Sequence, residues 1–267
     1  MSLRTEAHSL RAVLCLLFIT MLSVPCAAQE RKVPVVVSSK NFPESRLLGE
    51  IMAQLIERET DIPVERKLNL GFSTIVFQSI REGEIDLYPE YTGTAWEEYL
   101  KIGEKVSDKL KAYLIVSKRM AEELKIRWLM PFGFENSFAL AMESAQAKKL
   151  GISRISELKK HQSKLRVGVS NDFFQRNDGF QPLVKDYGLD LADVRQMEHG
   201  LIYRAISTGE VDIVDIWTTD GKLLRHDLKI LEDDRGFLPP YDCAPVIRAE
   251  TLQRYPQLEK VLNYLPF

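Results

Sequence analysis

The sequence contains little cysteine, and what it has is badly placed for cross-linking. It has three cysteines in 267 residues, and two of them, Cys15 and Cys26, lie near the N-terminus in a stretch that we expect to be removed. Only Cys243 would then remain, so an internal disulfide is excluded. Within PPYDCAPVIR, Cys243 is interpreted as a small buried hydrophobic residue rather than a nucleophile.

The sequence also lacks the usual signatures of catalysis and metal binding. It contains no G-x-S-x-G, H-E-x-x-H or C-x-x-C pattern and no phosphate-binding loop. Its four histidines, His8, His161, His199 and His226, are scattered and show no metal-ligand spacing. We therefore expect a protein that is not an enzyme and that needs no metal and no cofactor.

No excess of one charge is present. The formal net charge is -2, the pI is near 6.2, and no long run of like charges occurs. The electrostatic footprint of a nucleic-acid-binding protein is therefore missing. We expect neither a nucleic-acid partner nor a charged tail, and we expect a monomer.

Long apolar runs are missing too, except at the N-terminus. Two arginines precede AVLCLLFITMLSV, Ala12–Val24, which is short for a membrane span and is followed by small residues. This pattern is typical of a secretory signal, so we predict a signal peptide over residues 1–28, cleavage after Ala28 and a periplasmic product. The alternatives are an uncleaved membrane anchor and a lipid anchor on Cys26, which Pro25 disfavours.

Apolar strands alternate with amphipathic helices along the rest of the chain. This order predicts an α/β fold with mostly parallel sheets. The expected strands are 33–39, 64–70, 85–88, 165–170, 193–197, 211–216 and 228–231, and the clearest helices are 43–59, 73–82 and 107–124.

One stretch of the sequence occurs twice. FQSIREGEIDLYPEYT, residues 77–92, aligns without gaps on YRAISTGEVDIVDIWT, residues 203–218. Each copy reads as a helix, a glycine stop, a short apolar strand and an aromatic residue, Tyr91 or Trp217, at the end of the strand. The repeat predicts two similar α/β lobes.

Each lobe also carries a cation near a strand end. Lys40 follows the first strand, and Arg176 follows the strand RVGVS. Ligands of open α/β sheets bind outside the carboxyl ends of the strands, so each lobe would offer one aromatic ring and one cation at the same edge. Aromatic rings attract a quaternary ammonium group, and Lys or Arg can bind a carboxylate. Together they predict a clamp for a zwitterion with a methylated ammonium group.

Six segments of the chain resemble a known family. SSKNFPES, GEIDLYPEYTGTAW, PFGFENSFALAM, NDFFQRNDGF, IWTTDG and LEDDRGFLPPYDCAPVIR are similar, in this order, to the substrate-binding proteins of glycine betaine, choline and carnitine ABC importers. The resemblance implies a two-lobed periplasmic-binding-protein fold of the second type, with the ligand cleft between the lobes. It implies lobe I at 29–135 with 243–267 and lobe II at 136–242. It also implies an ABC permease as the membrane partner, and a role in osmoprotectant uptake or nutrient scavenging.

The resemblance also implies the site residues. The family's aromatic cage falls on Tyr91, Phe138, Trp217 and Tyr241, and its carboxylate contacts fall on Lys40, Thr94 and Arg176, with Asn136 beside the cage. Phe138 and Trp217 depart from the more usual tyrosines, which leaves the exact ligand open. Lys40 favours a carboxylate ligand, such as glycine betaine, over choline.

Other interpretations stay open at this point. Each aromatic of the cage could be a core residue or a cover for the hinge, and each cation could be a solvated turn residue. The protein could be a ligand sensor of the same fold, or could bind choline, carnitine, proline betaine or an amino acid; an envelope enzyme is the remaining alternative. The family usually continues beyond ETLQRYPQLEKVLNYLPF, so we expect lobe I to be less fully covered, or the receptor to be degenerate or truncated.

Overall fold

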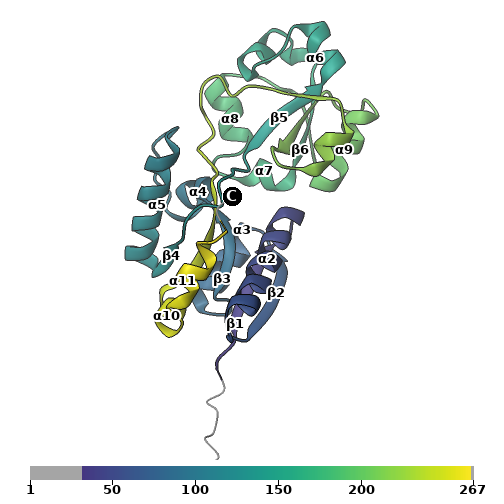
Figure 1. The fold of residues 1–267 in the computed structure, drawn as a ribbon. Helices are drawn as coiled ribbons and strands as arrows, with labels where there is room; N and C mark the ends of the chain where they lie inside the picture. The colour runs from purple at the N-terminus through teal and green to yellow at the C-terminus, as the bar shows by residue number, and fades with distance from the viewer. Residues whose placement is uncertain (1–31, 266–267) are drawn as a thin grey trace, which may run out of the picture. The chain divides into compact units, whose positions relative to one another are not determined.

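The computed structural model describes residues 32–265, and the predicted signal peptide lies outside them. Two five-stranded sheets, each with helices packed on it, account for most of these residues (Figure 1). The fold is a two-lobed α/β fold, as expected from the alternation of strands and helices. None of the helices among residues 32–265 is long and apolar enough to cross a membrane.

The first sheet has the strand order β2-β1-β3-β10-β4. Strands β1, β2 and β3 are parallel, whereas β10 returns from the end of the chain and is antiparallel to its neighbours. The strands are β1 (Val35–Lys40), β2 (Val64–Gly71), β3 (Leu87–Tyr91), β4 (Ile126–Trp128) and β10 (Cys243–Arg248). The helical segments of this lobe are α2 (Pro43–Glu59), α3 (Ser73–Glu82), α4 (Thr92–Thr94), the wide-turn η1 (Ala95–Tyr99), α5 (Lys109–Leu124), α10 (Ala249–Arg254) and α11 (Gln257–Leu262).

The second sheet repeats this plan with the order β7-β6-β8-β5-β9. Here β6, β7 and β8 are parallel, and β5 runs antiparallel beside β8, as β10 does beside β3. The strands are β5 (Phe138–Glu143), β6 (Arg166–Ser170), β7 (Asp193–Met197), β8 (Ile213–Trp217) and β9 (Leu228–Ile230). The helical segments are α6 (Ser144–Leu150), η2 (Ile155–Lys160), η3 (Gln162–Lys164), α7 (Asn171–Gln175), α8 (Phe180–Tyr187), α9 (His199–Ser207) and η4 (Gly221–Arg225).

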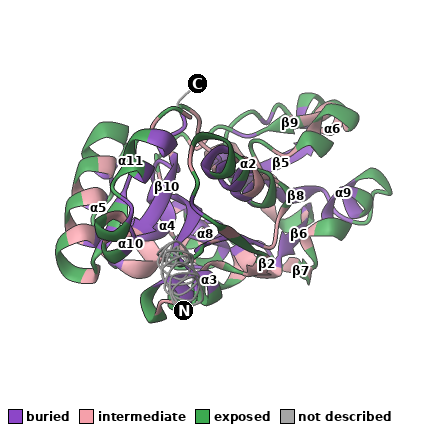
Figure 2. Ribbon diagram, turned by 60° about the horizontal axis from the view of Figure 1, so that its bottom comes forward, coloured by how far each residue is buried: buried purple, intermediate pink, exposed green. Residues whose placement is uncertain are grey.

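Helix α2 illustrates how the sequence builds these layers. Pro43 occupies its first turn, where the missing amide proton is not needed. Leu48, Met52 and Ile56 recur at helical spacing and are buried. Burying such side chains stabilises the fold by about 1.5–3 kcal/mol each. In Figure 2, β10 is buried while α5 turns exposed residues outward.

The sequence repeat has a structural counterpart. Asp86 and Asp212, which occupy the same position in the two copies, each accept a hydrogen bond at 2.9 Å from the backbone of the first parallel strand, at Val36 and Arg166. Each also donates its own backbone amide to that same residue, at 2.8 and 2.7 Å. The shared aspartate therefore fixes the third strand of each sheet against the first, and places Tyr91 and Trp217 at equivalent strand ends.

Two segments connect the sheets, one at residues 129–137 and one at residues 231–242. They bond to each other: the Asn136 amide donates to the Tyr241 carbonyl at 3.1 Å, and the Cys243 amide donates to the Phe134 carbonyl at 3.1 Å. A ligand between the sheets would therefore lie against these two hydrogen-bonded connecting segments.

Candidate functional site

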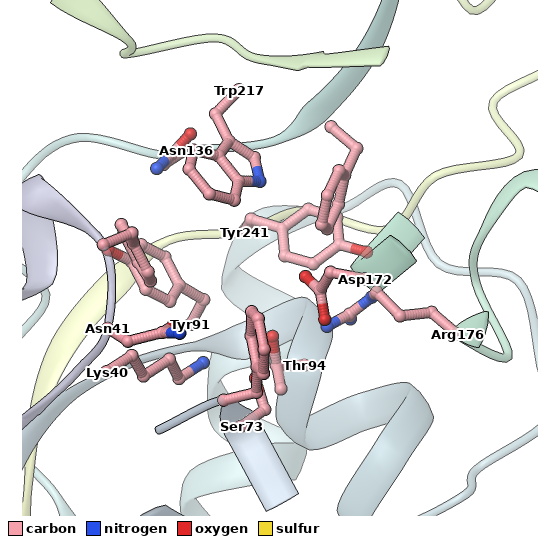
Figure 3. Close-up of a pocket in the computed structure, with 13 residues that line it drawn as sticks. Lys40, Asn41, Ser73, Tyr91, Thr94, Asn136, Asp172, Arg176, Trp217 and Tyr241 are labelled. Atoms are coloured by element: carbon pink, nitrogen blue, oxygen red, sulfur yellow. The ribbon is translucent and has the colours of Figure 1, made fainter. Parts of the chain in front are cut away.

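A hollow lies between the carboxyl ends of the two sets of parallel strands (Figure 3). It encloses about 450 Å³ of space without protein atoms, part of it open to solvent. The lining consists of Lys40, Asn41, Phe42, Phe72, Ser73, Tyr91, Thr94, Asn136, Phe138, Asp172, Arg176, Trp217 and Tyr241. All eight residues that the sequence suggested are in this set, although they come from segments far apart in the chain.

Aromatic rings form much of the wall. Phe138 lies edge-on to both Trp217 and Tyr241, with ring centroids 6.4 and 6.2 Å apart. Phe42, which the sequence analysis missed, lies 5.1 Å from Trp217 and 6.0 Å from Tyr91. Phe42 therefore joins the aromatic residue of one lobe to that of the other.

Tyr241 is fixed by a very close approach to the backbone. A side chain at Gly93 would place its Cβ 2.6 Å from two atoms of the Tyr241 ring. The ring therefore rests directly on the Gly93 backbone, and glycine is required there for steric reasons.

Tyr91 is fixed through its hydroxyl group. The hydroxyl donates to Glu44 Oε1 at 2.6 Å, and the side-chain amide of Asn136 donates to the same oxygen at 3.0 Å. Burial, with Cys243 and Glu44 nearby, raises the pKa of Tyr91 well above its ordinary value. The hydroxyl therefore stays protonated and acts as a donor.

Trp217 is held by stacking instead. His199 lies nearly parallel to it, with ring centroids 3.6 Å apart, and is 3.4 Å from Asp220 through Nε2. Burial lowers the pKa of His199, although Asp220 opposes this. The imidazole is therefore neutral at pH 7, so it places no competing cation against the indole ring.

Lys40 does not face the hollow as an unpaired cation. Its Nζ lies 2.5 Å from Glu90 Oε1, and the two side chains are 5% and 0% exposed. Glu90 also accepts hydrogen bonds from the hydroxyls of Tyr88 and Tyr99, at 2.9 and 2.7 Å. The charge of Lys40 is thus matched by a buried carboxylate.

Arg176 has a similar partner. Its guanidinium group forms a two-pronged pair with Asp178, at 2.6 and 2.7 Å, and Tyr241 donates to the same carboxylate. Burial opposes the charge of Arg176, but Asp178, Tyr241 and Asp172 together outweigh burial and raise the arginine's pKa above its ordinary value. The guanidinium carbon lies 5.1 Å from the Phe138 ring centroid and 5.9 Å from that of Tyr241.

Several members of this site were not predicted from the sequence. Phe42 and Asp172 lie in the quoted turns SSKNFPES and NDFFQR, but nothing in their spacing pointed to a ligand. Glu44, Glu90 and Asp178 act one layer behind the lining, where only the folded chain reveals their partners. Among residues 32–265, no group of three or more His, Cys, Asp or Glu side chains is arranged to hold a metal ion.

Comparison with known proteins identifies the family. The OpuAC family, described as the substrate binding domain of the ABC-type glycine betaine transport system, matches residues 33–267. The chain belongs to this family. The resemblance seen in the sequence is thereby confirmed, as is the two-lobed fold.

Individual OpuAC relatives agree with this assignment. The chain is 35% identical over 245 residues to an ergothioneine transport permease/ergothioneine binding protein of Helicobacter pylori; the match covers 91% of this chain but only 43% of that relative. It is 34% identical over 239 residues to a glycine-betaine-binding protein of Pseudomonas aeruginosa, covering 85% of this chain and 75% of that one. A crystal structure described as a glycine betaine/carnitine/choline ABC transporter superposes with a TM-score of 0.73 at 31% identity, over 87% of this chain and 86% of that one.

Proposed function

We propose that this OpuAC-family chain captures a quaternary ammonium compound, glycine betaine or a relative of it, and delivers it to an ABC permease. One observation carries the proposal: eight residues chosen from the sequence line a single hollow between the lobes, with aromatic rings from both lobes on its wall. A quaternary ammonium group cannot donate hydrogen bonds, so aromatic faces are its natural partners, at about 0.5–2 kcal/mol per ring.

Within the hollow, we place the ammonium group at the Phe42–Trp217 end. Lys40 lies 5.1 Å from the Tyr91 centroid, and Arg176 is close to the rings of Phe138 and Tyr241. These rings already have a protein cation nearby, whereas the His199 ring against Trp217 is neutral. The polar end of the ligand then points toward Thr94 and Arg176.

Capture would close the two lobes around the ligand. Phe42 belongs to lobe I, residues 29–135 with 243–267, and Trp217 belongs to lobe II, residues 136–242. A ligand that contacts both binds the closed arrangement more tightly and shifts the population toward it. We propose capture without chemical turnover, by a periplasmic monomer whose partners are the ligand and the permease.

A methylation series tests this function. Glycine betaine, dimethylglycine, sarcosine and glycine would be titrated calorimetrically into the purified protein. We expect affinity to rise with each methyl group, because each lost N–H removes a hydration requirement that aromatic rings cannot meet. Equal affinity for glycine and glycine betaine would contradict the proposal and favour an amino-acid receptor.

A further inference from the structure

The charge balance of the hollow is unusual for a zwitterion receptor. Three charged side chains line it: Lys40, Asp172 and Arg176. The two cations are paired with the buried carboxylates of Glu90 and Asp178. The Asp172 side chain makes no hydrogen bond or ion pair within the described range 32–265, although its charge acts on Arg176 nearby. The unbalanced charge on the wall is therefore negative.

Asp172 occupies a position where a ligand could meet it. It lies in the first turn of α7, is partly exposed, and sits beside Arg176 and Tyr241 in Figure 3. It also lines a second hollow that shares Phe72, Ser73 and Arg176 with the first. An ionised carboxylate can only accept hydrogen bonds.

The second hollow adds to the negative potential. Glu98 and Glu198 line it together with Asp172. Glu98 accepts from the Asn177 backbone amide at 2.9 Å, and Glu198 accepts from the Asn171 side chain at 3.3 Å. Neutral amides hold both carboxylates in place without cancelling their charge. Arg176 also lines this hollow, but its charge is paired with Asp178, so the carboxylates leave the recess with a net negative charge. Such a recess concentrates ligands of the opposite sign.

We propose that Asp172 is a specificity-determining residue. It favours quaternary ammonium ligands that carry a hydrogen-bond donor at the end away from the ammonium group. It disfavours ligands that carry only a carboxylate at that end. This inference rests on the proposed function, because it assumes that the ammonium group lies against the aromatic wall. A ligand hydroxyl or N–H at the Arg176 end would donate to Asp172. A carboxylate in the same place would meet a like charge, while the cations nearby already have partners.

Four probes separate the two chemistries. Choline carries a hydroxyl and no carboxylate, and propyltrimethylammonium carries neither. Carnitine carries both, and γ-butyrobetaine carries the carboxylate alone. In each pair we expect the hydroxyl compound to bind about tenfold more tightly to the wild-type protein, which is the value of one hydrogen bond to a charged acceptor. Tetramethylammonium reports on the aromatic wall alone.

Variants assign the effect to Asp172. Asp172→Leu removes the acceptor. We expect the ratio of affinities within each pair to fall from about tenfold to about one. The affinity for tetramethylammonium should fall by less than about twofold. Asp172→Glu keeps the charge and should restore part of the preference. Glu143→Gln is the matched control, because Glu143 is exposed at the end of β5 and lies outside both hollows. Thermal unfolding of each variant verifies that it is folded.

If the wild type shows no hydroxyl preference, or if Asp172→Leu retains it, the inference is wrong while the proposed function stands. If neither glycine betaine nor any of these five ammonium compounds binds the folded wild type, both the inference and the proposed function are wrong.

Discussion

Each lobe buries a carboxylate close to its strand-end aromatic residue, and the two lobes treat that carboxylate differently. In lobe I, Glu90 directly precedes Tyr91, is paired with Lys40 and accepts further bonds from two tyrosine hydroxyls. In lobe II, Asp215 lies two residues before Trp217 and accepts from Ser170, through its amide at 2.5 Å and its hydroxyl at 2.6 Å. Burial raises the pKa of Asp215 to about 7, although the hydrogen bonds from Ser170 oppose this rise.

The difference shows how a repeated fold can hold its two halves with unequal rigidity. The lobe I edge is held by an ion pair and by the bond from Tyr91 to Glu44, both buried or partly buried. The lobe II edge is held by the hydrogen bonds from Ser170 to Asp215 and by the His199 stack on Trp217. We infer that lobe I supplies a fixed wall and lobe II an adjustable one.

The largest expected effect comes from breaking the ion pair of lobe I. Glu90→Gln leaves the Lys40 charge buried without a partner, and losing one member of such a pair costs about 3–5 kcal/mol. Urea unfolding of the variant and the wild type measures this loss. An unchanged free energy of unfolding would mean that water or another group already compensates Lys40.

The corresponding change in lobe II should act in the opposite direction. Asp215→Asn keeps hydrogen-bonding capacity toward Ser170 but removes the ionisable group, so we expect it to stabilise the protein by about 1–3 kcal/mol at pH 8. Because burial raises the folded-state pKa from 3.8 to about 7, the stability due to protonated Asp215 is complete below about pH 3.8 and is lost as pH rises through about 7.

The pH profile of unfolding checks this sign. Between about pH 4 and pH 7 the stability of the wild type should decline more steeply than that of Asp215→Asn. The variant should keep part of the slope, because burial also raises the pKa of Glu97 to about 7. Parallel profiles for the two proteins would show that Asp215 does not titrate in this range.

Trp217→Ala tests the adjustable wall through binding. Losing one aromatic face should weaken a quaternary ammonium ligand by about 1–2 kcal/mol, roughly 5–30-fold, while stability changes less because the ring is partly exposed. Calorimetric titration measures the affinity, and Trp217→Phe, which keeps a ring, should recover part of it. Unchanged affinity in Trp217→Ala would remove this residue from the site.

The smallest effect is expected at the fixed wall. Tyr91→Phe keeps the ring but removes the hydrogen bond to Glu44, so stability should fall by about 1 kcal/mol and affinity by less than about threefold. Thermal unfolding and titration of the same sample separate the two quantities. A loss of affinity as large as that of Trp217→Ala would show that the two walls are equally adjustable.

Much of the fold was predictable because local patterns and tertiary packing agree. The helix over 43–59 and the strand over 193–197 match their predicted bounds. The short strands β4 and β10 were not predicted: IRW is too short to show a pattern, and CAPVIR has no clear alternation. The repeat placed Tyr91 and Trp217 at equivalent edges, because strand ends follow from sequence order.

The charge state of the site was not predictable in the same way. Lys40 and Arg176 were expected to hold a ligand carboxylate, but whether a cation is available depends on its neighbours in the fold. Glu90 lies 50 residues from Lys40, and nothing in the sequence links them. The role of both cations toward a ligand stays a prediction.

A crystal structure of the protein with the tightest-binding ammonium probe is the most direct test of the central claim. We predict the ammonium nitrogen within about 6 Å of the ring centroids of Trp217 and Phe42, the reach of a cation–π contact. A ligand bound outside this hollow, or inside it with its ammonium group turned away from both rings, would contradict the claim.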